Sequence, residues 1–392
     1  MHKMVKRMAA LVSNFSNNHC ANRRFAFIVH PSNYQHVKGL TASLKLITRI
    51  FPQSVIGGFL LHLPPIRYLS TAFAFGPSET ADCIGIICPM LPVQMVTHQE
   101  QTIKKILEAI RVAQRLGANL VGLGGFTSII GDGGLEIARK SPLPVTSGNT
   151  YTATVILQSI SSAADLLELD LKTARIAIIG ATGDIGSACA KELAKRCGCL
   201  VLVARNEERL RLLSDTLKKD CAAVEIAKKP GQAASNADVV VTVTSSITTL
   251  IEPHELKSGS IICDASYPAN VSREVRSLRN DVLVFEGGIV CWPELWQQVA
   301  KDNPLWNFNP PVGVHGCFAE TLLLALEKRF TTYSIGRGGI TSEKIYEMAR
   351  IADKYRVSPA KLWNGQGSYS SKEIEVIKRA RLGQGATYPA LS

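Results

Sequence analysis

The chain has 392 residues, of which 46% are hydrophobic and 19% are charged; this is the composition of a folded globular protein and excludes a disordered one. The length exceeds what one ordinary hydrophobic core needs and predicts two or three domains. The net charge of +12 suits an acidic partner or a phosphorylated ligand, but no basic stripe interleaved with aromatic residues accompanies it, so we do not predict nucleic-acid binding.

The first domain is predicted from alternating strand and helix patterns. Residues 1–24 carry five basic and no acidic residues and are expected to form a mobile basic arm. Residues 25–150 are expected to form an N-terminal α/β domain that holds the substrate. Its predicted elements are strands at 25–29, 84–88, 119–123 and 144–146, and a helix within 97–116 whose inner face is Ile103, Ile106, Leu107, Ile110 and Ala113.

A long helical pattern from Thr150 leads into a second domain over residues 151–290. Six further strand patterns alternate with helices there, which predicts the open parallel sheet of a Rossmann domain. These strands are expected at 175–179, 200–204, 224–227, 238–244, 260–264 and 282–285. Residues 291–392 form a mostly helical C-terminal part, with its clearest helices at 318–330 and 341–355 and a loose tail from residue 383.

The ten cysteines are scattered, and Cys197 and Cys199 form the one close pair. No secretory signal and no second pair at metal-site spacing are recognised, so neither disulfides nor a metal site is predicted. We expect a reduced, cytoplasmic protein in which these two cysteines lie near the end of a helix and the start of a strand. The most apolar long run, residues 55–76, is interrupted by polar residues and prolines and is not expected to span a membrane; peripheral membrane contact is left open.

A glycine-rich loop follows the first strand of the second domain. Phosphate binding needs glycines where the backbone turns sharply and approaches a diphosphate, with a helix N-terminus behind them. This position therefore predicts a dinucleotide site, with a purely structural turn as the alternative. The loop residues expected at the cofactor are Gly180, Thr182, Gly183, Asp184, Ile185 and Gly186.

The end of the next strand distinguishes NAD from NADP. An acidic residue there binds the ribose 2′-hydroxyl, whereas an arginine accommodates a 2′-phosphate. Here the strand leads to Arg205 and Asn206, with no acid before Glu207, so we predict NADP(H); a surface arginine at a helix cap is the alternative. Thr244 and Ser245, after a later strand, are expected along the cofactor crevice or, alternatively, to be ordinary loop residues.

Cys317 stands at the predicted start of an apolar helix, two residues after His315. A thiol at a helix N-terminus near a cation has a lowered pKa and is a good nucleophile. Cys317 and His315 are therefore candidate catalytic residues, although spacing alone favours a buried, inert cysteine.

The chain resembles the cyanobacterial long-chain acyl-acyl-carrier-protein reductases in a series of segments that occur in the family's order within residues 84–355. They are Leu123–Ile130, Thr146–Thr150, Gly180–Ala188, Ala204–Asn206, Gly287–Val290, Cys317–Glu320, and Gly336-Arg337 followed by Ile340-Thr341. The resemblance implies an NADPH-dependent reductase that takes a fatty acyl group from an acyl carrier protein or coenzyme A thioester and releases a fatty aldehyde. The family's acyl-bearing cysteine corresponds to Cys317.

The first two of these segments are expected to line the acyl site or to stabilise its oxyanion, with a structural role for their glycines as the alternative. Their residues are Gly124, Gly125, Phe126, Thr127, Ser128, Ser147, Gly148, Asn149 and Thr150.

The sequence also departs from the family's pattern. A lysine of the family is replaced by Ala269, and Cys291-Trp292 replaces an acid and a histidine. Two other interpretations remain open. One is an NADP oxidoreductase of the shikimate dehydrogenase or glutamyl-tRNA reductase kind, acting on a small polar substrate. The other is a non-catalytic nucleotide-sensing protein.

Overall fold

A computed structural model describes residues 21–40, 52–75, 79–293, 295, 313–362 and 367–384. Most of the predicted basic arm and of the C-terminal tail lies outside these ranges. The described end of the arm is structured, because Ala21–Arg23 form the 3-10 helix η1 and Arg24 begins the first strand and pairs with Asp82 at 3.0 Å.

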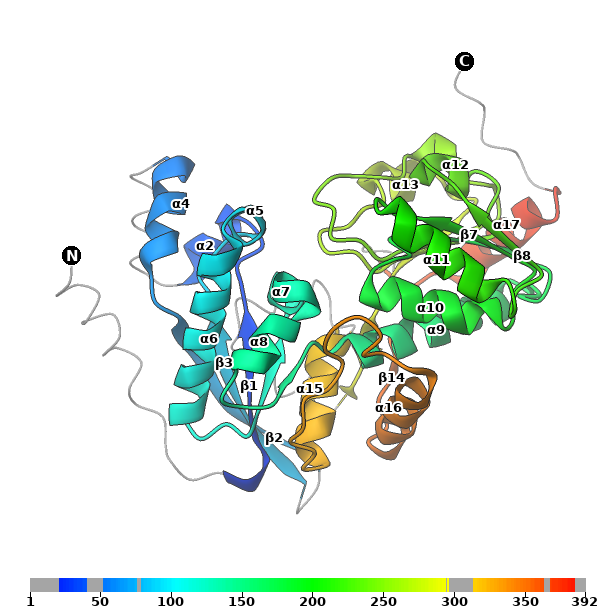
Figure 1. The fold of residues 1–392 in the computed structure, drawn as a ribbon. Helices are drawn as coiled ribbons and strands as arrows, with labels where there is room; N and C mark the ends of the chain where they lie inside the picture. The colour runs from blue at the N-terminus through cyan, green and yellow to red at the C-terminus, as the bar shows by residue number, and fades with distance from the viewer. Residues whose placement is uncertain are drawn as a thin grey trace. The chain divides into compact units, whose positions relative to one another are not determined.

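The described chain divides into two compact units (Figure 1). The first comprises residues up to Asn149 together with Trp292–Gly339 and Ile351–Arg356, and the second comprises Thr150–Cys291, Ile340–Arg350 and the residues from Val357 onward. Residues 291–392, taken together in the sequence analysis, are thus divided between the two units.

The first unit is built on a five-stranded sheet in the order β2-β3-β1-β4-β5. The strands are β1 (Arg24–Val29), β2 (Ile66–Ala74), β3 (Thr80–Ile87), β4 (Leu120–Leu123) and β5 (Val145–Thr146). All neighbours are parallel except β2 and β3. The four predicted strands are confirmed. β2 is absent from the prediction because one apolar run covers both it and the helix before it.

Helices cover both faces of this sheet (Figure 1). Ala26 and Ile28 of β1 pack in one core with α6, whereas Phe25 and Phe27, which alternate with them, contact the ring of Phe318 on α15. The buried stripe predicted for α6 is confirmed. The helices of the unit are α2 (Tyr34–Leu40), α4 (Gln53–His62), α5 (Pro92–Thr97), α6 (Gln99–Arg115), η2 (Gly125–Ser128), α7 (Ile130–Gly133), α8 (Leu135–Lys140) and α15 (Gly316–Leu326), which follows β13 (Val314–His315).

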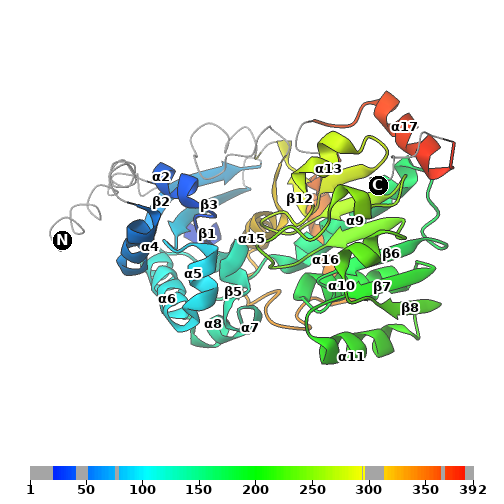
Figure 2. The same ribbon diagram turned by 90° about the horizontal axis from the view of Figure 1, so that it is seen from above.

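The second unit contains a six-stranded parallel sheet in the order β11-β10-β9-β6-β7-β8 (Figure 2). Its strands are β6 (Arg175–Ile179), β7 (Cys199–Val203), β8 (Ala223–Ile226), β9 (Val239–Thr242), β10 (Ile261–Asp264) and β11 (Leu283–Glu286). Numbered along the chain, this order is 3-2-1-4-5-6, which is that of the Rossmann fold. The predicted fold class is confirmed.

The remaining elements are α9 (Asn149–Leu166), α10 (Asp184–Ala194), α11 (Glu207–Leu217), α12 (Pro230–Ala234), η3 (Pro253–Glu255), α13 (Arg273–Leu278), β12 (Ile289–Cys291), α16 (Ser342–Lys354), β14 (Ser358–Pro359) and α17 (Ser371–Arg381). Among them, β12 and β14 pair antiparallel in a separate small sheet. Helices α15 and α16 confirm the two C-terminal helices expected from the sequence. No helix within the described ranges is both long and apolar enough to cross a bilayer.

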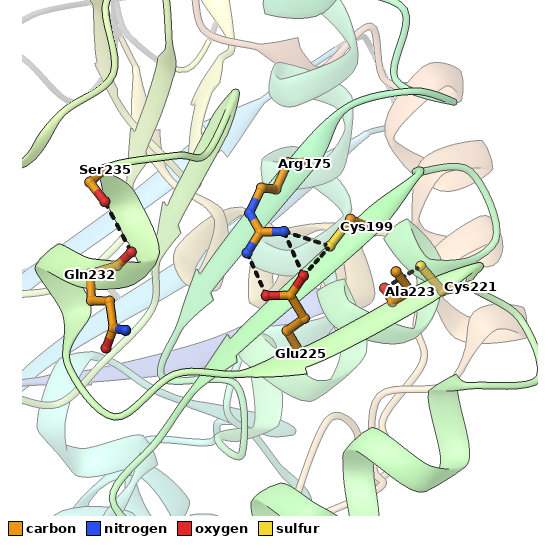
Figure 3. Close-up of polar contacts among 7 residues, drawn as sticks. All are labelled: Arg175, Cys199, Cys221, Ala223, Glu225, Gln232 and Ser235. Atoms are coloured by element: carbon orange, nitrogen blue, oxygen red, sulfur yellow. Dashed lines mark hydrogen bonds and ion pairs between the residues drawn. The ribbon is translucent and has the colours of Figure 1, made fainter.

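Polar contacts at the amino end of the second sheet hold three neighbouring strands together (Figure 3). Arg175 donates two hydrogen bonds to Glu225, at 2.6 and 2.7 Å, and a third to the Sγ of Cys199 at 3.2 Å. Burial raises the pKa of Cys199 and of Cys197. As predicted, Cys197 follows a helix and Cys199 begins a strand.

Candidate cofactor site and active site

The glycine loop after β6 is shaped by close backbone contacts. Gly180 has φ +94°, and a Cβ added there would overlap the carbonyl oxygen of Val243. A Cβ at Gly186 would overlap the carbonyl oxygen of Gly180. The N–H groups of Gly180 and Ala181 both donate to the Val203 carbonyl, at 2.9 and 3.0 Å. At Gly180 and Gly186, glycine is therefore required by close contacts with the protein's own backbone.

Gly183 differs from them. It is exposed and has φ −73° and ψ 167°, a conformation that any residue adopts, as the N-cap of α10. A Cβ added there would lie 3.3 Å from the Gly180 carbonyl oxygen, with no overlap of the kind found at the other two glycines. The fold itself does not require glycine at this position. A diphosphate that approaches the helix N-terminus does require it, because a side chain would occupy the space of the ligand. Asp184 and Ile185 begin α10 directly behind this position, so the loop fits a dinucleotide.

The carboxyl ends of β7 and β8 present three basic side chains. Arg205 is exposed and makes no hydrogen bond or ion pair with any residue that the structure describes. Lys228 and Lys229 follow β8, the neighbouring strand, and are also exposed. Asn206, predicted at the cofactor, caps α11 by accepting a hydrogen bond from the Arg209 N–H at 2.9 Å. Its side-chain oxygen already has a structural partner.

A buried hydrogen-bond network organises the ends of β9 and β10. Asp264 accepts hydrogen bonds from the Thr242 hydroxyl at 2.5 Å and from the Asn270 N–H at 2.9 Å. The Thr244 hydroxyl donates to the Asn270 side-chain oxygen at 2.5 Å, whereas Ser245 is exposed. Burial raises the pKa of Asp264. Thr244 thus shapes the loop. Asp264, an acidic residue at the end of an apolar strand, was not predicted as a site residue.

Cys317 lies in the first unit, as the second residue of α15. The backbone N–H groups of Gly125, Phe318 and Cys317 itself favour the thiolate form of this side chain. A Cβ added at Gly148, where φ is +72°, would overlap the Cα and Cβ of Cys317. The structure therefore brings the two predicted glycine segments, far apart in the chain, against the candidate nucleophile.

Burial, aided by the nearby Glu320 carboxylate, outweighs the three N–H groups and raises the pKa of the Cys317 thiol to about 11. The prediction that the helix start lowers this pKa is wrong as a net effect. Removal from water disfavours the thiolate by more than the N–H groups restore. Cys317 is therefore a neutral thiol at neutral pH.

Glu320 is fully buried and anchors α15 to the rest of the unit. Its Oε1 accepts hydrogen bonds from the hydroxyls of Thr146 and, at 2.8 Å, Ser334. The Ser147 hydroxyl donates to the Ser334 carbonyl at 2.5 Å. Glu320 lies in the Cys317–Glu320 segment that resembles the reductase family, but it was not predicted as a site residue. Its hydrogen bonds hold Cys317 beside the end of β5.

The other predicted pocket residues mostly shape their own loops. The Thr127 and Ser128 hydroxyls are buried and donate to the carbonyls of Gly124 and Gly125, at 2.8 and 2.7 Å. Phe126 is buried as well. Asn149 and Thr150 are buried at the start of α9, with Thr150 assigned to the second unit.

Two histidines lie close to these segments. His315 is the N-cap residue of α15, and its side chain makes no capping hydrogen bond. His30, which was not predicted as a site residue, accepts a hydrogen bond through Nε2 from the Phe126 N–H at 3.0 Å. Within the described ranges, no group of three or more potential metal ligands was found.

The second unit has a recognisable family relation. The profile of the shikimate / quinate 5-dehydrogenase family matches residues 161–285, which carry the glycine loop and β6 to β11. This match and the geometry of the loop identify a nicotinamide-nucleotide-binding unit.

Three curated proteins are similar over longer stretches. The chain is 28% identical over 345 residues to the aminotransferase PigE of Serratia sp., covering 85% of this chain but only 39% of that protein. It is 26% identical over 186 residues to the glutamyl-tRNA reductase of Cyanophora paradoxa, covering 45% and 42% of the two chains. It is 34% identical over 286 residues to the long-chain acyl-[acyl-carrier-protein] reductase of Synechococcus elongatus, covering 69% of this chain and 81% of that protein. The chain carries a nicotinamide-nucleotide-binding unit and belongs to the long-chain acyl-[acyl-carrier-protein] reductase family.

Proposed function

We propose that the protein reduces a long-chain acyl thioester of acyl carrier protein or coenzyme A to a fatty aldehyde, using NADPH and an acyl group held on Cys317. The observation that supports this most strongly is the close packing of Gly148 on Cys317, together with the backbone N–H groups of Gly125, Cys317 and Phe318 that favour its thiolate. Donors fixed in this way stabilise negative charge on the sulfur and on a carbonyl oxygen beside it.

The reaction has two steps. The Cys317 sulfur bonds to the acyl carbon, the bond from that carbon to the carrier sulfur breaks, and the carrier leaves as a thiol with the proton that Cys317 loses. When bound, NADPH would supply a hydride to the acyl carbon. With one proton, the carbon–sulfur bond to Cys317 then breaks to release aldehyde and regenerate the thiol.

A proton acceptor is needed for the first step, because a thiol with a pKa of about 11 is protonated at neutral pH. We assign this role to His315, which precedes Cys317 by two residues at the N-cap of α15. His315→Gln is expected to slow acylation of Cys317 and to leave NADPH binding unchanged.

The preference for NADPH over NADH is proposed from charge at the ends of β7 and β8. Arg205 has no partner among the described residues, and Lys228 and Lys229 leave the adjacent strand at the same edge of the sheet. A 2′-phosphate would give this exposed positive cluster its counter-charge.

The deciding experiment separates acylation from reduction. The protein is mixed with a long-chain acyl thioester without NADPH, and the added acyl mass is mapped by peptide mass spectrometry; NADPH is then added and aldehyde is measured. We expect one acyl group on Cys317, discharged as aldehyde. Cys317→Ser should lose both steps yet bind NADPH. Cys291→Ser is the matched control, because Cys291 is also partly exposed.

Acylation at another cysteine, or full activity of Cys317→Ser, would refute the proposal. Acylation without discharge would refute the reductase step and favour a protein that has lost turnover, the interpretation that the missing lysine at Ala269 keeps open. The similarity to glutamyl-tRNA reductase supports a second candidate, a reductase of a small polar acyl group. Faster reduction of a glutamyl thioester than of a long-chain thioester would favour that candidate.

A further inference from the structure

His30 occupies a position in the first unit that the proposed reaction does not yet use. It follows β1 directly, while Gly124 and Gly125 follow β4, the strand paired with β1. Because the two strands are parallel, their carboxyl ends meet at one edge of the sheet, and the Gly124 N–H donates to the Ile28 carbonyl at 2.8 Å. The imidazole thus lies beside the glycine segment that contacts Cys317.

The contacts of His30 determine which of its nitrogens carries the proton. Nε2 faces the Phe126 N–H at 3.0 Å, so it must be the acceptor. The proton then sits on Nδ1, which donates to the Pro31 carbonyl at 3.1 Å. The ring also packs edge-on against Phe126, with centroids 5.7 Å apart and planes at 89°. Two hydrogen bonds and one ring contact hold the imidazole in a single tautomer and orientation.

The turn that His30 holds also touches the sulfur. Gly125 has φ +57°, and a Cβ added there would lie 2.7 Å from His30 Nε2, so the imidazole packs directly on this glycine. The Gly125 N–H favours the thiolate form of Cys317. The same short turn therefore contacts His30 through its Phe126 N–H and Cys317 through its Gly125 N–H.

We propose that His30 is a positioning residue, whose neutral imidazole holds the Gly125–Phe126 turn so that the Gly125 N–H points at the Cys317 sulfur. The inference rests on the proposed role of Cys317 as the acyl-bearing nucleophile. A histidine suits the task because it offers a rigid acceptor on one side and a donor on the other. Burial lowers the pKa of His30 to about 4, so the ring remains neutral, and Nε2 remains an acceptor, at physiological pH.

The test compares side chains that keep or lose the acceptor. His30→Leu retains bulk without an acceptor, and His30→Gln offers its side-chain oxygen to the Phe126 N–H. We expect His30→Leu to slow acylation of Cys317 by at least about tenfold, the usual consequence of losing one hydrogen bond to a charged group. His30→Gln should recover most of that loss, and NADPH affinity should be unchanged in both variants. His36→Leu is the control, since His36 bonds to Ser32 on the same segment.

A second measurement separates positioning from general stability. Iodoacetamide alkylation of Cys317 reports the thiolate directly, and the Gly125 N–H lowers the pKa of this thiol. His30→Leu should therefore slow alkylation at every pH below that pKa, whereas a merely structural change would lower the melting temperature and leave the alkylation rate of the folded protein unaltered. If His30→Leu does not fold, His30→Gln and His30→Asn make the same comparison, because asparagine is one methylene shorter and does not reach.

Wild-type rates of Cys317 acylation and alkylation in folded His30→Leu would overturn the inference; His30→Asn takes its place if His30→Leu does not fold. Rates in folded His30→Gln no higher than those of the variant that lacks the acceptor would also overturn it. The proposed function fails separately, when wild-type protein is not acylated on Cys317.

Discussion

The substitution Gly183→Ala separates the demands of the fold from those of the ligand. Gly183 has φ −73°, so alanine adds no backbone strain, and its Cβ would sit 3.3 Å from the Gly180 carbonyl oxygen, which requires a shift of a few tenths of an ångström. Replacing glycine by alanine in an allowed conformation also reduces the entropy of the unfolded chain, which stabilises by about 0.4–1 kcal/mol. The two effects oppose each other, and we expect a change in unfolding free energy within about 1 kcal/mol of zero.

Cofactor binding should respond quite differently. The added methyl group occupies space through which a diphosphate approaches the N-terminus of α10, so NADPH affinity should fall by about two decades, equivalent to about 2.7 kcal/mol. Gly183→Val, which is larger, should abolish binding. Gly186→Ala should behave in the opposite way, because its Cβ overlaps the Gly180 carbonyl oxygen and destabilises the fold itself.

The assay combines urea unfolding with titration of NADPH by its fluorescence. A folded Gly183→Ala protein with wild-type affinity for NADPH would refute the placement of the diphosphate at this loop. A large loss of stability in the same variant would refute the structural argument, since it would mean that the fold needs a glycine at this position.

Four further changes have definite expected outcomes. Arg205→Ala should weaken NADPH binding by about one to two decades and leave NADH binding unchanged in parallel titrations; equal wild-type affinities for both cofactors would contradict the proposed 2′-phosphate contact. The alkylation rate of Cys317 should rise about tenfold for each pH unit between 7 and 9, since the thiolate fraction grows in that proportion below a pKa of about 11, and a plateau in this range would contradict that value. Glu320→Gln removes the carboxylate that raises the pKa of Cys317, so alkylation at fixed pH should accelerate. A slower rate in the folded variant would contradict this effect of Glu320. Asp281→Ala removes the buried carboxylate to which the buried Arg279 donates at 2.6 and 2.9 Å, and it should cost about 3–5 kcal/mol in urea unfolding, while a cost below about 1 kcal/mol would show that the pair is dispensable.

Local signals in the sequence were sufficient for the second unit and for its cofactor loop. Its six strands are short apolar runs separated by helical patterns, and each predicted strand lies within two residues of the observed one. All of these strands except the exposed edge strand β8 are mostly buried, and buried strands of a parallel sheet carry this apolar signal without help from distant residues. The glycine loop is likewise contiguous in the chain, which is why Gly180, Gly183 and Gly186 are recognisable from the amino-acid sequence alone.

Tertiary structure alone decided the surroundings of Cys317. Its contacts come from Gly125 and Gly148, and the hydrogen bond from Phe126 to His30 joins residues 96 positions apart. No local pattern encodes such pairings, because they arise where separate strands end at one edge of a sheet. The direction of the Cys317 pKa shift also could not be predicted from the sequence. A helix start is visible in sequence and favours the thiolate, but burial, which depends on everything packed around the sulfur, opposes it and prevails.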